Sequence, residues 1–261
     1  MLRYQAEPQT FYSLSFINEY QKSSVEPEAL EDFDIRDDLI ALGLDPRTGE
    51  TRGTVSALAF DANRNTTNNL LDARRGYVVG LHVERAVPWA WGTYDYWSTT
   101  VDARHYQSVG NLFVVANRLH IGSIDPGGDD QDNVPFAKRF FLGGASSNRG
   151  WGRFELSPLS GFGFPIGGLT MLDGAAEVRF PIWGKIGGVA FLDYANVWSD
   201  AWTFDGGELR YAVGPGLRYQ TPIGPARIDV GYQLNPIEGL LVEGEPQKRQ
   251  WRVHFSIGQA F

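Results

Sequence analysis

Residues 251–261 read WRVHFSIGQAF, and side chains of two kinds alternate along them. The odd-numbered positions are Trp251, Val253, Phe255, Ile257, Gln259 and Phe261, and the even-numbered positions are Arg252, His254, Ser256, Gly258 and Ala260. One face is almost wholly apolar and the other is polar or small, which predicts a β-strand between two different environments. A membrane barrel and a soluble β-sandwich both produce this pattern, so the other strands must decide between them.

The same two-residue period recurs along most of the chain. The further segments are 10–21, 54–61, 76–84, 98–106, 111–123, 172–182, 187–198, 209–220 and 228–234. Many exceed the usual strand length of about five or six residues and approach the roughly 9–11 residues that a tilted strand needs to cross a bilayer. Their connections alternate between long and short, as in outer-membrane barrels. The sequence therefore predicts an all-β fold, an antiparallel transmembrane β-barrel with about ten strands in this chain.

The ends and the second faces of these strands support a membrane barrel over a soluble β-domain, which remains the alternative at this point. Aromatic side chains stand near strand ends, as interfacial girdles require: Tyr106, Trp183, Trp198, Tyr219 and Trp251. The Trp residues at 89, 91 and 97 fit an interfacial role or loop packing better than a sugar site. The second faces carry Arg, Asp, Glu, His and Gly, whereas a water-facing sheet more often carries Lys, Thr and Ser.

Composition narrows the classes of function. The 261 residues have a net charge of −8, which argues against a nucleic-acid partner. Cysteine is absent, so disulfides and thiolate metal sites are excluded. The opening residues MLRYQAEPQTF contain no signal-peptide pattern, which leaves a cytoplasmic chain or a signal outside these residues as expectations. The acidic segment 23–51 is compatible with a short helix within 26–44.

One connection, about 125–168, contains an unusual stretch, FFLGGASSNRGWGRFELSP at 140–158. Gly143 and Gly144 permit backbone angles closed to other residues, and the large aromatics indicate a loop with a fixed shape rather than a flexible linker. Such a loop would hold the guanidinium of Arg149 in a fixed position. The carboxylates on the predicted inner faces are Asp173, Glu177, Asp193 and Asp229. Arg149 either pairs with them or lies at a solvated surface, and spacing alone leaves both open.

No motif for bond chemistry is present. The histidines at 82, 105, 120 and 254 lack metal-ligand spacing, so we expect no metal and no cofactor. There is no GxSxG elbow for a hydrolase. The segment GGASSNRG lacks the Lys-Ser/Thr ending of a phosphate loop. These observations predict a protein that is not an enzyme.

Several segments together resemble the BamA/TamA family of outer-membrane assembly factors, also called the bacterial surface antigen family. They are RFFLGGASSNRGW (139–151), GAAEVRFPI (174–182), FLDYANVW (191–198), LRYAVGPGLRYQTPIGPARIDVGYQLN (209–235) and WRVHFSIGQAF (251–261). The first is similar to the family's loop with a (V/I)RG(F/Y) tetrapeptide, here Asn148-Arg149-Gly150-Trp151. Asn148 and Trp151 depart from the usual residues, and Ala195 replaces a Gly of the family's FxDxGN strand.

The resemblance implies a fold. Residues 1–261 would form one partial outer-membrane barrel domain, the C-terminal part of a barrel of about sixteen strands, without POTRA domains. The loop at about 125–168 would lie in the lumen, supported by Gly143 and Gly144, with Arg149 against Asp193 and Glu177 and with Phe191 on the face of Asp193. The terminal strand would be both a lateral seam and an assembly signal, through Trp251, Phe255, Gly258 and Phe261.

The implied function is assembly, insertion or translocation of other outer-membrane proteins in the bacterial outer membrane. The partners would be outer-membrane lipids, nascent β-barrel proteins and accessory lipoproteins. A passive channel, a two-partner-type secretion transporter and a membrane anchor for an N-terminal enzyme domain are the alternatives. The strand number leaves three explanations open: a fragment of a longer gene, an engineered truncation or a small complete barrel. The two exposed edges of ten strands favour the first, because unpaired edges are costly in lipid.

Overall fold

The computed structural model describes residues 1–7, 9–24, 44–45, 47–88, 91–128, 133–242 and 244–261. The helix considered within 26–44 falls almost wholly outside the described residues. No helix in the described ranges is long and apolar enough to cross a membrane.

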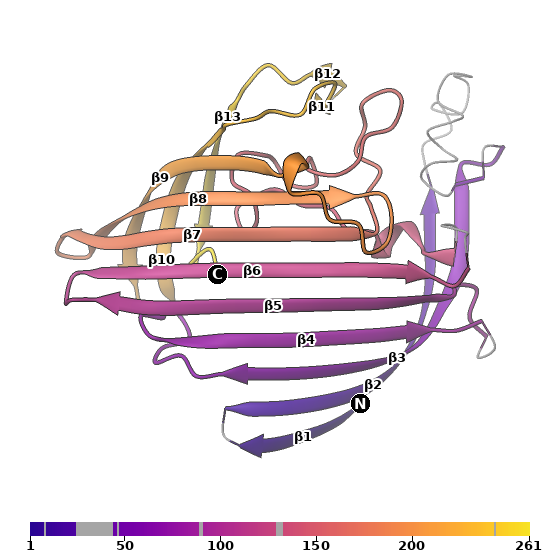
Figure 1. Cartoon of the computed structure of the whole chain (residues 1–261), viewed down its shortest axis with the longest axis horizontal. Helices are drawn as coiled ribbons and strands as arrows, with labels where there is room; N and C mark the ends of the chain where they lie inside the picture. The colour runs from indigo at the N-terminus through magenta and orange to yellow at the C-terminus, as the bar shows by residue number, and fades with distance from the viewer. Residues whose placement is uncertain (8, 25–43, 46, 89–90, 129–132, 243) are drawn as a thin grey trace.

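The fold is one large antiparallel sheet (Figure 1). Its eleven strands are β1 (Leu2–Glu7), β2 (Thr10–Ser24), β3 (Glu50–Asn65), β4 (Gly76–Ala86), β5 (Tyr96–Val109), β6 (Phe113–Pro126), β7 (Thr170–Trp183), β8 (Ile186–Trp198), β9 (Arg210–Thr221), β10 (Gly224–Gln233) and β13 (Trp251–Ile257). Each strand pairs with the next in this order. A separate hairpin, β11 (Leu241–Val242) with β12 (Glu245–Pro246), lies in the connection between β10 and β13.

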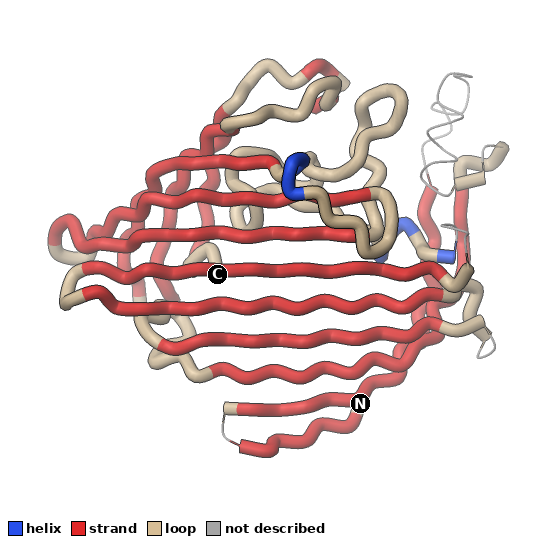
Figure 2. Tube along the Cα trace, viewed as in Figure 1, coloured by secondary structure: helices blue, strands red, loops and turns tan. Residues whose placement is uncertain are grey.

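Long and short connections gather at opposite ends of the sheet (Figure 2). Short turns join β5 to β6, β7 to β8 and β9 to β10, whereas long connections join β6 to β7 and β8 to β9. The two short helical turns, η4 (Phe136–Lys138) and η5 (Gly206–Glu208), lie in these long connections. This asymmetry is the one that outer-membrane barrels show.

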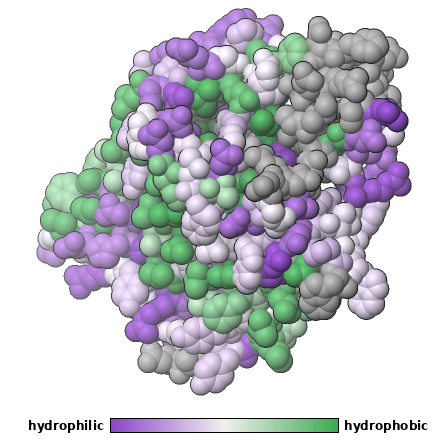
Figure 3. All heavy atoms as spheres, turned by 45° about the vertical axis from the view of Figure 1, so that its right-hand side comes forward, coloured by the Kyte–Doolittle hydropathy of each residue, from purple (hydrophilic) through white to green (hydrophobic). Residues whose placement is uncertain are grey.

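The apolar faces of the strands point outward and away from the interior of the sheet. On β13, Trp251, Val253 and Phe255 are 48%, 55% and 71% exposed. Figure 3 shows patches of apolar side chains over the left and central parts of this face, interspersed with hydrophilic ones. A β-sandwich would bury such a face against a second sheet. The fold class predicted from the alternation is confirmed, because the described strands form a single barrel-like sheet with its apolar side outside.

The sheet has one strand more than the alternation indicated, and it does not close. Residues 2–7 are too few to identify as a strand from sequence, but they pair with β2 from Leu2↔Leu14 to Glu7↔Thr10. Among the described residues, β1 and β13 each have a strand partner on one side only. The chain therefore forms a partial barrel with two free edges.

The terminal strand is shorter than predicted, and its end turns inward. β13 ends at Ile257, because Gly258 has a φ of +101°, which breaks the alternation. The side-chain amide of Gln259 then donates to Asp72 Oδ1 at 2.8 Å. The ring of Phe261 lies 6.4 Å from that of Tyr106, on the inner side of the sheet. The placement of Phe261 on the outer face, expected from its odd number, is therefore wrong.

Candidate functional site

The connection between β6 and β7, which we call the lumen loop (residues 127–169), folds back against the inner face of the sheet. It has its own internal pairing, with isolated bridges Phe140↔Gly168, Leu142↔Leu156 and Leu159↔Pro165. These bridges satisfy backbone groups that would otherwise lack partners away from water. The loop therefore has a defined shape, as its aromatic content indicated.

The tip of the lumen loop, residues 143–152, depends on a glycine turn. Gly143 and Gly144 have φ values of +101° and +97°. A Cβ at Gly143 would collide with the carbonyl oxygen of Gly152. The backbone N–H of Gly144 donates to the carbonyl of Trp151 at 3.0 Å, which closes the tip around Arg149.

Trp151 fastens the tip by packing. Its side chain is fully buried. The cluster around it contains Leu142 and Leu156 from the loop, Met171, Ala195, Val197 and Ala212 from the strands, and Leu240. Burying an aromatic of this size is a large apolar contribution. Apolar packing of Trp151 thus attaches the tip to the wall independently of the ion pairs.

Arg149 is fully buried and forms a fork with Asp193 of β8. Its Nε donates to Oδ2 at 2.8 Å and its Nη2 donates to Oδ1 at 2.6 Å. Its backbone N–H also donates to Asp193 Oδ2, at 2.9 Å. Nη1 donates to Glu177 Oε1 of β7 at 2.6 Å, and Asp229 Oδ2 of β10 lies 3.7 Å from it. Of the two arrangements open at the sequence level, the structure places Arg149 among carboxylates and away from the solvated surface.

The charge of Arg149 is further supported by an aromatic ring. The guanidinium carbon lies 3.4 Å from the ring centroid of Phe191, which precedes Asp193 on the same face of β8. Burial alone would lower the pKa of the Arg149 guanidinium, but hydrogen bonds to Asp193 and the charges of Glu177 and Asp229 raise that pKa above its usual value. The side chain therefore remains a cation at physiological pH.

Two of the three carboxylates, Glu177 and Asp229, have other cationic partners that sequence reasoning did not assign. Arg179 Nε donates to Glu177 Oε2 at 2.8 Å, and Arg218 Nη1 donates to Asp229 Oδ1 at 2.6 Å. Arg227 Nη1 donates to Asp229 Oδ2 at 3.2 Å. The alternation placed these arginines on inner faces, but only the register between strands shows which carboxylate each one meets. The site is an ion network rather than one pair.

Other groups of the tip are bonded to the wall as well. Gln233 Nε2 donates to the carbonyl of Gly150 at 2.8 Å, and Asn148 Nδ2 donates to the carbonyl of Arg210 at 3.0 Å. Gly231 has no room for a side chain, because a Cβ there would collide with the carbonyl oxygen of Arg149. Asn148 is thus a contact to the wall even though it departs from the residue usual in the resembling family.

The inner face of the terminal strand also contacts the loop. His254 Nε2 lies 3.0 Å from the carbonyl oxygen of Arg149, and an oxygen acceptor requires that nitrogen to carry the hydrogen. Arg252 Nη2 lies 2.5 Å from Glu155 Oε1, and Glu155 accepts from the backbone N–H of Gly152. These inner contacts alternate with the exposed outer residues Val253 and Phe255. The lumen loop therefore touches the strand that carries one of the free edges.

Asp173 and Phe261 are not among the partners of Arg149. Asp173 pairs with Arg118 Nη1 at 3.1 Å, farther along the inner wall. Phe261 lies beside Arg179, with the guanidinium carbon 5.4 Å from its ring centroid. Within the described ranges, no three His, Asp or Glu side chains gather in a way that could hold a metal ion.

An antiparallel sheet with an apolar exterior, an ionic interior and a loop fixed inside it defines the class of outer-membrane β-barrel proteins. The model of the Omp85 superfamily domain matches residues 2–261, and the chain belongs to this superfamily. The family places the chain in the bacterial outer membrane.

Individual relatives agree with the predicted resemblance. The chain is 26% identical over 251 residues to the outer membrane protein assembly factor BamA of Neisseria meningitidis, covering 83% of this chain and 30% of that protein. It is 28% identical over 233 residues to BamA of Nitratidesulfovibrio vulgaris, covering 88% and 28%. The chain thus spans less than a third of the length of these relatives.

A solved structure shows the same fold. A crystal structure of BamA from Haemophilus ducreyi lacking POTRA domains 1–3 is similar with a TM-score of 0.77 at 18% identity. The similarity covers 96% of this chain and 52% of that chain. The predicted resemblance to the BamA/TamA family and the predicted barrel fold are therefore confirmed.

Proposed function

We propose that this barrel segment takes part in assembling or inserting other outer-membrane proteins, through a lateral seam at β13 and without bond chemistry. The observation that carries the proposal is Arg149, buried and bonded to Asp193 and Glu177, which holds a shaped loop against the inside of the terminal strand. The names of the relatives supply the class of activity. The partners would be nascent β-barrel proteins, the surrounding lipids and accessory lipoproteins.

The free edge of β13 is the second support for a seam. Its partner β10 pairs with it from Ala226↔Ile257 to Tyr232↔Trp251, and its other edge has no strand in the described part of the chain. An unpaired edge is a template for strand addition. A nascent strand could pair there while the lumen loop keeps β13 in position.

The test is replacement of Arg149 in the protein as the organism produces it. Arg149→Ala removes the cation, and Arg149→Lys keeps the charge but loses the fork geometry. We expect Ala to abolish and Lys to reduce the folding of a heat-modifiable reporter barrel protein in the outer membrane. Arg153→Ala is the matched control, because Arg153 is an exposed loop arginine near Phe154. Wild-type reporter folding in a correctly folded Arg149→Ala variant would overturn the proposal.

The passive-channel alternative makes a different prediction. The lumen loop occupies the interior, so a barrel with an assembly role should conduct little until residues 140–157 are deleted, whereas a passive channel should conduct with the loop in place. In planar bilayers, high conductance of the intact protein would support the channel. Conductance that rises only after the deletion would support a loop-filled barrel with an assembly role.

A further inference from the structure

The first arm of the lumen loop, residues 133–140, meets a different part of the wall from the Arg149 tip. Lys138, at the end of η4, places its Nζ 2.9 Å from Oε1 and 3.0 Å from Oε2 of Glu84 on β4. Tyr96 at the start of β5 donates its hydroxyl to Glu84 Oε1 at 2.5 Å. None of these residues belongs to the Arg149 network.

Glu84 needs this partner. Its side chain is 3% exposed, and a buried carboxylate is costly unless a cation and hydrogen bonds compensate it. The ring of His82 is farther away, with its Nε2 at 3.8 Å from Glu84 and its Nδ1 at 2.7 Å from Asp61. Lys138 is therefore the near, two-oxygen partner of this carboxylate.

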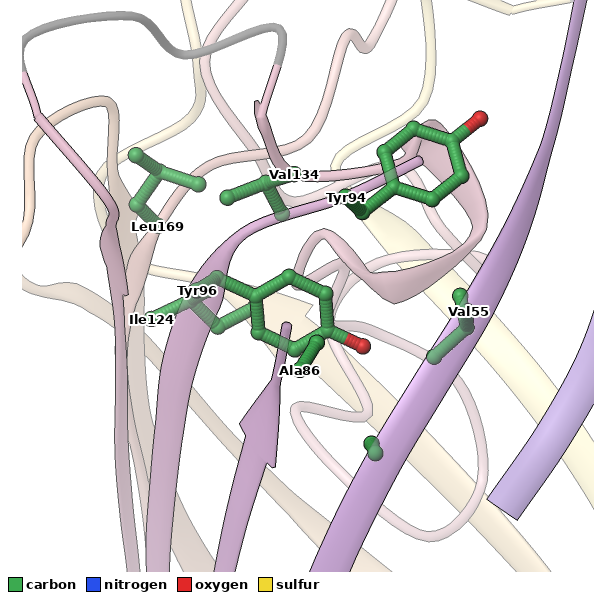
Figure 4. Close-up of a cluster of buried hydrophobic side chains, with 8 residues drawn as sticks. Val55, Ala86, Tyr94, Tyr96, Ile124, Val134 and Leu169 are labelled. Atoms are coloured by element: carbon green, nitrogen blue, oxygen red, sulfur yellow. The ribbon is translucent and has the colours of Figure 1, made fainter. Parts of the chain in front are cut away.

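An apolar cluster lies beside the ion pair. Val134 from the first arm packs with Tyr94, Tyr96, Val55, Ile124 and Leu169. Figure 4 shows Val134 between Leu169 and Tyr94, above the ring of Tyr96. The backbone N–H of Asp95 also donates to the carbonyl of Asn133 at 3.2 Å. Charge, packing and backbone contacts thus hold the same short stretch of the loop.

We propose that Lys138, Glu84 and Tyr96 form a second anchor of the lumen loop, which holds its first arm to β4 and β5 independently of Arg149. The loop then braces the wall between β4 and the C-terminal strands, with Phe140 packed against the apolar clusters at both ends. Lys138 and Glu84 are positioning residues in this account. Their consequence for assembly rests on the proposed function, but the attachment itself is measurable without it.

The absence of cysteine makes a direct test possible. Ala137 and Ser146 are exposed residues of the first arm and the tip, so each can carry a single spin label on an introduced cysteine. We expect Lys138→Met to remove the immobilised component from the spectrum of the label at 137 and to leave the spectrum of the label at 146 unchanged. Arg149→Met should do the reverse. Lys248→Met is the matched control, because Lys248 pairs with Glu245 at an exposed site.

Two further variants guard against misfolding. Glu84→Gln keeps the shape and an acceptor for Tyr96, so it should fold and still free the label at 137. Exchanging the charges, Glu84→Lys with Lys138→Glu, should restore the immobilised component that each single change removes. An unchanged label at 137 in Lys138→Met, or equal loosening at 137 and 146, overturns the second anchor. Neither outcome depends on whether the protein assembles other proteins.

Discussion

Arg149 contributes to the fold mainly through what its removal would leave behind. Its carboxylate partners Asp193, Glu177 and Asp229 are buried in the wall, so each depends on nearby cations. A buried ion network adds little stability compared with apolar packing. Removing one partner is nevertheless strongly destabilising, because the remaining charges stay buried without compensation. We therefore expect that removing Arg149 destabilises the protein mainly by leaving buried carboxylates without a cation, and less by the loss of its own hydrogen bonds.

We predict that Arg149→Met lowers the free energy of unfolding by about 3–5 kcal/mol, because an uncompensated charge stays buried. The double variant Arg149→Met with Asp193→Asn should recover part of this loss, since Asn carries no charge. Urea unfolding from lipid vesicles measures both. A double variant that loses the full sum of the two single changes would contradict the account.

Close approach of the tip to β10 gives a second residue-scale prediction. Gly231→Ala adds a methyl group against the carbonyl oxygen of Arg149, so it should destabilise by about 1–3 kcal/mol through overpacking. Gly206→Ala is the control, because nothing lies within 4 Å of its Cβ position. Equal unfolding midpoints for the two variants would show that the tip does not rest against Gly231.

At the scale of elements, alternation predicted most of the strands. The predicted 76–84 became Gly76–Ala86, and 187–198 became Ile186–Trp198. The misses have physical reasons. Residues 2–7 (LRYQAE) alternate over six positions only, which is too short a pattern to identify a strand, and their pairing with β2 identifies it. β13 ends early at Gly258, and the alternation over 251–261 gave no sign of this end.

The orientation of β8 gives an element-scale prediction. Leu192 lies at the middle of this strand and faces outward, at 38% exposure. Leu192→Arg should destabilise the protein by about 2–4 kcal/mol, the cost of a charge at the lipid midplane. Leu112→Arg, in the exposed turn between β5 and β6, should cost about 0–1 kcal/mol, as at an interface. Equal costs in vesicle unfolding would mean that β8 does not face lipid.

At the scale of the whole molecule, the chain is a curved sheet whose loop joins distant parts of the wall. The strand pattern placed Asp193 and Glu177 on inner faces together with two other carboxylates, and the family resemblance singled out these two as partners of Arg149. The sequence could not predict the contact of Lys138 with Glu84, which are 54 positions apart and lie in segments with no shared pattern. Such contacts follow only from the order and curvature of the strands.

The central claim is that the apolar side of each strand faces lipid while the charged side encloses the interior. The direct measurement places a bimane fluorophore on single cysteines at 252, 253, 255 and 256 of β13 and quenches it with nitroxide-bearing lipids. The account predicts strong quenching at 253 and 255 and weak quenching at 252 and 256, where the side chains of Arg252 and Ser256 point to Glu155 and Arg227. Uniform quenching, or stronger quenching at the even positions, would contradict it.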